Sequence, residues 1–143
     1  MSDTPPIDRD ATPASLRTIA MPADTNPNGD IFGGWILSQM DLAGGTHAFF
    51  EAQGRVATVA VTAMKFHKPV MVGDEVSCYC VTSRVGRTSI SVRVETWVRR
   101  RHRAIDEQVT EGLFTFVALD DDGRPRTVGG EAPIELSPGA ADQ

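Results

Sequence analysis

The chain has 143 residues, of which 41% are hydrophobic and 23% are charged, a composition typical of one globular domain. Its formal net charge is −5, and its basic residues are scattered or lie in one short run, which argues against a nucleic-acid-binding protein. A chain of this length leaves much apolar surface uncovered, so a subunit interface is expected.

Residues 1–15 are polar, contain prolines and lack the apolar segment of a signal peptide, so we predict a disordered N-terminal arm. A short strand is predicted at residues 16–21, before a turn-rich stretch that ends at Asp30. A long helix is predicted from residue 33 to about residue 52. Its apolar stripe at a spacing of three or four residues consists of Ile36, Met40, Ala43, His47 and Phe50.

The following part of the chain is rich in β-branched residues and predicts four strands, at residues 55–66, 75–85, 88–99 and 108–119. Their connections are short, so the strands should be mainly antiparallel neighbours. One apolar helix covers one face of a sheet, which predicts an α+β fold with about five strands wrapped around the helix. This domain spans residues 16–120, and residues 121–143 are predicted to be a partly disordered extension.

The pair Gly33 and Gly34 stands at the predicted start of the helix, shortly after Asp30. The first turn of a helix has unpaired N–H donors and a partial positive charge, and glycine lets a ligand carbonyl approach the backbone closely. Such a turn can form an oxyanion hole. The alternative is structural: Asp30 caps the helix, and the glycines only allow a tight turn before it.

Asp41 is the one formally charged residue between Asp30 and Glu51 when His47 is neutral. Its neighbours on the helix surface are small or apolar, so a carboxylate there is costly without a partner or a chemical task. Burial makes a carboxylate a stronger base, and Asp41 is therefore a candidate catalytic base. The alternative is a surface aspartate on an exposed turn of the helix.

The stretch 84–92 places Gly86 in a turn between two strands, where Arg87, Thr88 and Ser89 can donate hydrogen bonds to phosphate. An ordinary solvated turn is the alternative. The basic run 99–103 is interpreted as a solvated connection, with nucleotide phosphates as a second interpretation. Cys78 and Cys80 lie two residues apart on one strand, so no disulfide is expected and the cytoplasm is the predicted location.

No motif for a metal or a common cofactor is recognised. The histidines and cysteines lack metal-ligand spacing, so we predict no metal, and the chain has no Gly-x-Ser-x-Gly, P-loop or dinucleotide fingerprint.

Residues 17–41, RTIAMPADTNPNGDIFGGWILSQMD, closely resemble the YciA-like bacterial acyl-CoA thioesterases of the hotdog-fold superfamily. The segments RVATVAV at 55–61, VGDEV at 72–76 and residues 84–91 follow in the expected order, so the resemblance covers residues 16–120. It implies a hotdog fold and an enzyme of fatty acid metabolism that hydrolyses acyl-CoA to a free carboxylic acid and CoA. No cofactor is implied beyond CoA itself as part of the substrate.

The resemblance also implies a dimer that pairs two sheets edge to edge, commonly three dimers in a hexamer, with active sites between subunits. The implied catalytic residues are Asp41, Asp30, Gly33 and Gly34. The implied CoA-binding residues are Thr58, Val59, Ala60, Gly86, Arg87, Thr88 and Ser89. Phe32 departs from the pattern, since many other hotdog thioesterases have histidine before the glycine pair.

The residues and the resemblance together predict that N–H groups near Gly33 or Gly34 polarise the thioester carbonyl while Asp41 activates water. Direct attack by Asp41 to form an anhydride is an open alternative. Two other function classes also stay open. A hotdog dehydratase or hydratase would act on the β-carbon without releasing thiol, and a non-catalytic acyl-CoA sensor would not need Asp41. Neither a nucleic acid nor a membrane is expected as a partner.

Overall fold

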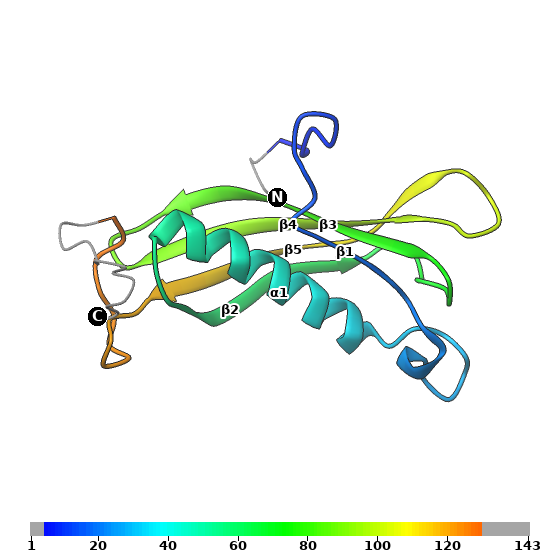
Figure 1. Cartoon of the computed structure of the whole chain (residues 1–143), viewed down its shortest axis with the longest axis horizontal. Coiled ribbons are helices and arrows are strands. Elements are labelled where there is room, and N and C mark those ends of the chain that lie inside the picture. Colours follow the sequence, from blue (N-terminus) through cyan, green and yellow to red (C-terminus); the bar gives the residue numbers. More distant parts are fainter. Residues whose placement is uncertain (1–4, 130–143) are drawn as a thin grey trace, which may run out of the picture.

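The fold is one long helix that lies across one face of an antiparallel sheet (Figure 1). The computed structural model describes residues 5–129. In chain order the elements are β1 (Leu16–Ile19), the 3-10 helix η1 (Pro22–Asp24), α1 (Gly33–Ala52), β2 (Val56–Phe66), β3 (Glu75–Val85), β4 (Ser89–Arg99) and β5 (Asp106–Ala118). The strand order is β1-β3-β4-β5-β2. The predicted α+β layout of five strands and one helix is therefore confirmed.

Strands β2 and β3 follow one another in the chain but are not neighbours in the sheet. β2 pairs with β5 and forms one edge, whereas β3 lies between β1 and β4 near the other edge. The connection 67–74 and helix α1 both lead from one side of the sheet to the other. As a result, the outer edge of β2 pairs with no strand within residues 5–129.

Helix α1 packs closely on the sheet. Its buried residues are Ile36, Met40, Ala43, Gly44, Ala48 and Ala52. A Cβ atom on Gly44 would stand 3.2 Å from the Phe116 ring and 3.4 Å from a methyl group of Val94. The missing side chain of Gly44 thus lets the helix backbone come close to β4 and β5.

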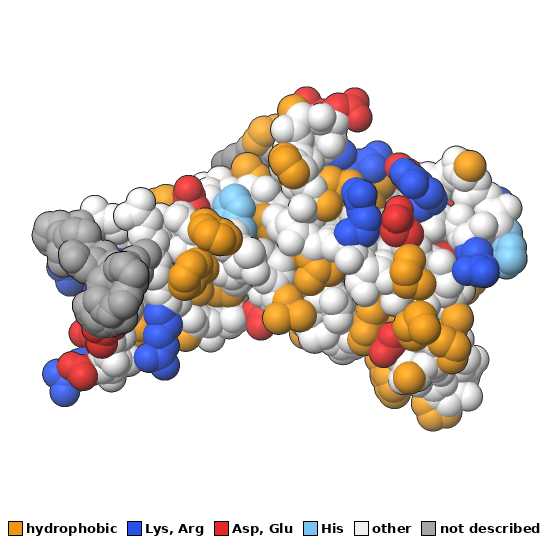
Figure 2. All heavy atoms as spheres, in the orientation of Figure 1, with side chains coloured by type: hydrophobic (Ala, Val, Ile, Leu, Met, Phe, Trp, Pro, Cys, Tyr) orange, Lys and Arg blue, Asp and Glu red, His pale blue; other side chains and the backbone are white. Residues whose placement is uncertain are grey.

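The predicted apolar stripe of α1 is wrong at Phe50, whose side chain is 72% exposed. His47 is half-buried, and its Nε2 lies 2.8 Å from the hydroxyl oxygen of Thr82. Apolar residues surround α1 on most sides, so their spacing does not show which side faces the sheet. Figure 2 shows hydrophobic side chains exposed over the C-terminal half of the helix.

Residues 5–15 lie on the sheet face opposite α1. The Arg9 guanidinium is 3.6 Å from the centre of the Trp97 ring, and the Ile7 N–H donates to a Glu95 carboxylate oxygen at 3.2 Å. At the other end of the chain, the Val128 N–H donates to the Arg87 carbonyl at 2.8 Å. The predicted disorder at residues 1–4 and 130–143 lies outside the described residues.

Within residues 5–129, no helix combines the length and the apolar character needed to cross a membrane.

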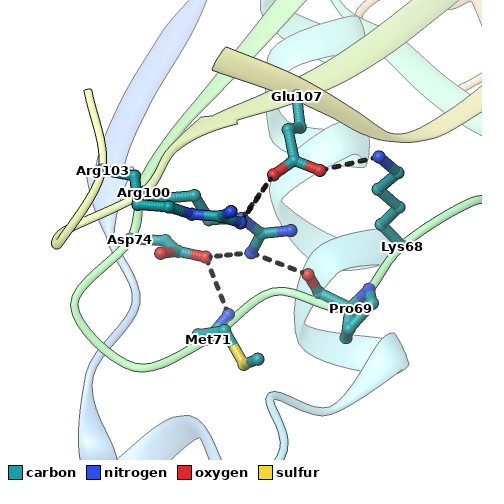
Figure 3. Close-up of polar contacts among 7 residues, drawn as sticks. All are labelled: Lys68, Pro69, Met71, Asp74, Arg100, Arg103 and Glu107. Atoms are coloured by element: carbon teal, nitrogen blue, oxygen red, sulfur yellow. Dashed lines mark hydrogen bonds and ion pairs between the residues drawn. The ribbon is translucent and has the colours of Figure 1, made fainter. Parts of the chain in front are cut away.

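A buried ion pair joins the connection 67–74 to the hairpin between β4 and β5 (Figure 3). Asp74 is 2% exposed, and its Oδ2 lies 2.7 Å from Nη1 of Arg100. The same guanidinium donates to the Pro69 carbonyl at 3.0 Å and lies 3.3 Å from Glu107. The Val70 carbonyl in this connection accepts the Ile31 N–H at 3.4 Å. The ion pair therefore holds the loop that supports the start of α1.

A second ionic cluster links β4, β5 and the end of β2. One Arg93 nitrogen lies 2.9 Å from Glu95 and 2.7 Å from Glu111, and His67 Nε2 lies 2.9 Å from the other Glu111 oxygen. Partial burial acts to raise the pKa of Glu111, but the hydrogen bond from His67 and the charge of Arg93 outweigh it. The pKa of Glu111 is therefore held below its ordinary value of 4.5.

Replacing Arg100 with alanine is expected to lower the free energy of unfolding by about 3–5 kcal/mol, because the buried Asp74 carboxylate loses its cation. Urea denaturation followed by circular dichroism measures the change. Arg101→Ala is the matched control, since Arg101 is exposed and makes no ion pair within residues 5–129. The control should change stability by less than about 0.5 kcal/mol. Equal stability of the two variants would contradict the proposed role of the ion pair.

The lowered pKa of Glu111 predicts a loss of stability in acid. The folded state favours the charged carboxylate, so this contribution is present above the unfolded pKa near 4.5 and is lost as the pH falls through the lower folded pKa. Glu111→Gln should unfold more easily at neutral pH and show a weaker dependence of stability on pH below 4.5. Denaturation at a series of pH values measures both effects. Parallel pH curves for parent and variant would exclude this role of Glu111.

Candidate active site

A cavity of about 450 Å³ opens between helix α1 and the edge strand β2. Its wall is formed by Asp41, Leu42, Gly45, Thr46, Phe49, Arg55, Val56, Thr58 and Phe116. Leu42, Phe49, Val56 and Phe116 provide the apolar part of the wall. Asp41 is the one carboxylate of the wall, and Arg55 is the one cation. The cavity thus combines an apolar surface with one acid.

Asp41 and Thr58 meet at this cavity, although they are 17 residues apart in sequence. The Thr58 hydroxyl donates to Oδ1 of Asp41 at 2.7 Å. Thr58 lies where the pairing of β2 with β5 shifts register, between Thr58 and Ala60. Asp41 is half-buried, and its Oδ2 has no hydrogen-bond partner within residues 5–129. One oxygen is therefore fixed in place while the other is available to accept a proton.

The start of α1 offers free backbone donors. Phe32 is the N-cap residue, and no side chain caps the helix, so the alternative that Asp30 is the cap is wrong. Asp30 is exposed, and its N–H donates to the Asn26 side chain at 3.1 Å. In the described part of the chain, the N–H groups of Gly33 and Gly34 have no acceptor. They are available to an oxygen atom of a ligand.

The glycine pair and Asp41 do not meet within one chain. Gly33 and Asp41 are eight residues apart in α1. At 1.5 Å per residue, their backbones are about 12 Å apart along the helix axis. A single thioester carbonyl cannot contact both. The structure therefore brings Asp41 and Thr58 together but leaves the predicted oxyanion donors of the same chain out of reach.

The hairpin of Gly86, Arg87, Thr88 and Ser89 lies at the end of the sheet where α1 ends (Figure 1). The Gly86 N–H donates to the Ser89 carbonyl at 2.8 Å and closes the turn. None of the four residues lines the cavity. The other predicted CoA contacts, Val59 and Ala60, lie beyond Thr58 on β2 and are also outside the cavity wall, with Val59 57% exposed.

Other reactive side chains are poorly suited to nucleophilic or metal chemistry. Burial raises the pKa of Cys78 to about 11 and that of Cys80 to about 12, so both thiols stay protonated at neutral pH. Burial also lowers the pKa of His47. No group of three or more His, Cys, Asp or Glu side chains within residues 5–129 could hold a metal ion.

Comparison with known proteins identifies relatives over most of the chain. The sequence profile of the Thioesterase superfamily matches residues 28–105. An uncharacterized acyl-CoA thioester hydrolase of Haemophilus influenzae is 55% identical over 124 residues, which are 85% of this chain and 80% of that protein. The acyl-CoA thioester hydrolase YciA of Salmonella typhimurium is 52% identical over 119 residues, which are 78% of this chain and 86% of that protein.

The structural comparison agrees with the sequence comparison. Cj0915, a hexameric hotdog fold thioesterase of Campylobacter jejuni, matches with a TM-score of 0.80 and 43% sequence identity, over 84% of this chain and 92% of that chain. The predicted hotdog fold is confirmed.

Proposed function

The chain belongs to the thioesterase superfamily, and from this membership we propose that it is an acyl-CoA thioesterase that releases a carboxylic acid and CoA. The observation that carries the proposal is the carboxylate of Asp41, held by Thr58 at 2.7 Å in the wall of an apolar cavity. The identity of 52% with YciA, an acyl-CoA thioester hydrolase, supports acyl-CoA as the substrate.

In the proposed reaction, Asp41 acts as the general base. Thr58 fixes Oδ1, and Oδ2 accepts a proton from a water molecule that attacks the thioester carbon. The tetrahedral oxyanion accepts hydrogen bonds from the N–H groups of Gly33 and Gly34, where the helix also presents its positive end. When the C–S bond breaks, the electron pair leaves with sulfur as a thiolate, which needs little help from an acid. The reaction requires no cofactor.

The donors for the oxyanion must come from a second copy of the chain. Asp41 and Gly33 of one chain are about 12 Å apart along the helix, so a complete site pairs Asp41 of one copy with the helix start of another. Exposed apolar residues on β2 and α1 support this pairing, because a second copy would cover them. They are Val59, Val61 and Phe66 on β2 and Leu42, Phe49 and Phe50 on α1. A dimer that joins two β2 edges is therefore proposed, and the likeness to a hexameric thioesterase favours three dimers per assembly.

The CoA part of the substrate is assigned to the segment from Thr58 to Ala60 and to the hairpin from Gly86 to Ser89. The hairpin carries an arginine and two hydroxyl groups, which bind phosphate well. Asp30 is exposed near the helix start and is retained as a second candidate acid, with no step of the reaction assigned to it.

Asp41→Asn tests the proposed chemistry, because the amide has nearly the same shape but cannot accept a proton from water. The kcat for butyryl-CoA should fall by about 10²–10⁴-fold, measured by the release of free thiol. Circular dichroism and sedimentation should show an unchanged fold and oligomer. Asp121→Asn is the control, since Asp121 is exposed in the turn after β5 and should keep parental activity.

Two results would overturn the proposal. A parental rate in Asp41→Asn would show that Asp41 is not the base. A parent protein that binds acyl-CoA but releases no thiol would not be a thioesterase, and would favour a dehydratase, a hydratase or a sensor.

Mixed oligomers test whether each site is shared between chains. Gly33→Pro removes one N–H group from the helix start, where proline is well tolerated. Phe32 before it has an extended ψ of 136°, and a Cβ at Gly33 would make only ordinary contact with Phe66 at 3.7 Å. Gly33→Ala keeps the N–H group and is the size control.

Gly33→Pro should be less active than Gly33→Ala. Oligomers refolded from a mixture of Asp41→Asn and Gly33→Pro chains should be more active than either variant alone, because a mixed dimer has one intact site. Thiol release measures all rates. A mixture no more active than the mean of its components would place the complete site within one chain.

A further inference from the structure

The basic side chains at the two ends of the sheet have different surroundings. At the end that carries the β4–β5 hairpin, cations and carboxylates form ion pairs, namely Arg99 with Glu75 and Asp106, Arg100 with Asp74 and Glu107, and both Lys68 and Arg103 with Glu107. Figure 3 shows the side chains of Lys68, Arg100 and Arg103 around Glu107, and Figure 2 shows blue and red side chains close together in this region. Most of the basic run 99–103 is therefore already neutralised by protein carboxylates.

The end of the sheet where α1 ends is different. Arg55, Arg84 and Arg87 are exposed there, and none of them has a carboxylate partner within residues 5–129. The end of β5 runs between Arg55 and Thr88, the residue after Arg87, because the Leu119 N–H donates to the Arg55 carbonyl and the Ala118 N–H donates to the Thr88 carbonyl, each at 2.9 Å. Neighbouring strands are about 4.8 Å apart, so the backbones at Arg55 and Thr88 are separated by about 10 Å. Three guanidinium groups that form no ion pair within residues 5–129 thus lie at this end.

Arg55 is the member of this group that lines the cavity. It stands three residues before Thr58, which holds Asp41, and a strand covers about 10 Å in three residues. Val56 and Phe49 form an apolar wall of the same cavity. The cavity therefore has a carboxylate at one position, a guanidinium without an ion pair in the described chain at another, and an apolar wall alongside them.

We propose that Arg55 binds a phosphate group of the CoA moiety, an assignment that rests on the proposed thioesterase function. With the thioester at Asp41, the uncharged pantetheine arm lies along the apolar wall. The phosphates at its other end then lie at Arg55. Guanidinium binds phosphate through two parallel hydrogen bonds. Because Arg55 is exposed and forms no ion pair within residues 5–129, a phosphate displaces no carboxylate of this part of the chain.

A carboxylate at the far end of an acyl chain would carry the same kind of charge. Phosphate is favoured by the position of Arg55, which is exposed in the cavity wall and separated from the hairpin of Arg87, Thr88 and Ser89 only by the end of β5. A nucleotide that projects out of the cavity meets both groups. Arg55 is thus assigned to the phosphates and not to acyl-chain selection.

The test compares Arg55→Ala with the parent on two substrates, butyryl-CoA and butyryl-pantetheine, which share the thioester but differ in the phosphates. The KM for butyryl-CoA should rise about 10- to 100-fold, as for loss of a hydrogen-bonded charge pair, with kcat little changed. The kinetics with butyryl-pantetheine should be the same for parent and variant. Arg55→Lys should recover part of the affinity for butyryl-CoA.

Arg101→Ala is the matched control, because Arg101 is also exposed and unpaired within residues 5–129 but lies in the opposite hairpin. It should leave both substrates unaffected. An equal rise of KM for both substrates in Arg55→Ala would overturn the phosphate assignment. So would a change seen with succinyl-CoA but not with butyryl-CoA, since it would assign Arg55 to the acyl group.

A binding measurement separates this proposal from the proposed function. Calorimetry with CoA and with pantetheine reports the phosphate contact without any hydrolysis. Weaker CoA binding in Arg55→Ala, with unchanged pantetheine binding, would support the contact between Arg55 and phosphate even if the parent released no thiol. Unchanged CoA binding would overturn the assignment of Arg55 to phosphate even if the parent were an active thioesterase.

Discussion

The close approach of α1 to the sheet at Gly44 is the contact on which the site depends. The Phe116 ring beneath Gly44 also forms part of the cavity wall, and Gly45 leaves the adjacent space open. Asp41 lies one turn before these glycines, so the depth at which the helix sits also sets the reach of its carboxylate toward Thr58. The same close packing therefore sets the core and places the acid. A side chain at position 44 would push the helix away from the sheet and Asp41 away from Thr58.

Charged side chains serve two separate purposes in this fold. Asp74 and Arg100 are buried together and connect distant loops, so each is needed to offset the desolvation of the other. Exposed cations at the other end of the sheet contribute little to stability, since water solvates them well. The fold thus separates the charges that hold it together from those available for recognition.

The sequence predicts the local features of the fold well. The bounds of α1 and β3 agree with the structure, because a long helical pattern and the Gly73 and Gly86 turns mark them locally. Contacts between residues that are distant in the sequence cannot be predicted from local patterns. The contact of Thr58 with Asp41 depends on β2 lying beside β5, and the exposure of Phe50 depends on which side of an apolar helix meets the sheet. The spacing of apolar residues does not distinguish a core from a surface that a second subunit covers.

Strand β2 has 11 residues, and Lys65 is its one charged side chain. Apart from this lysine and two shifts of register, it lacks the features by which proteins keep sheet edges from pairing with other chains. If the proposed dimer covers this edge, a newly synthesised chain is prone to aggregate until it meets another copy. Assembly would then be part of folding itself, and the yield of native protein would depend on how much of the chain a cell produces.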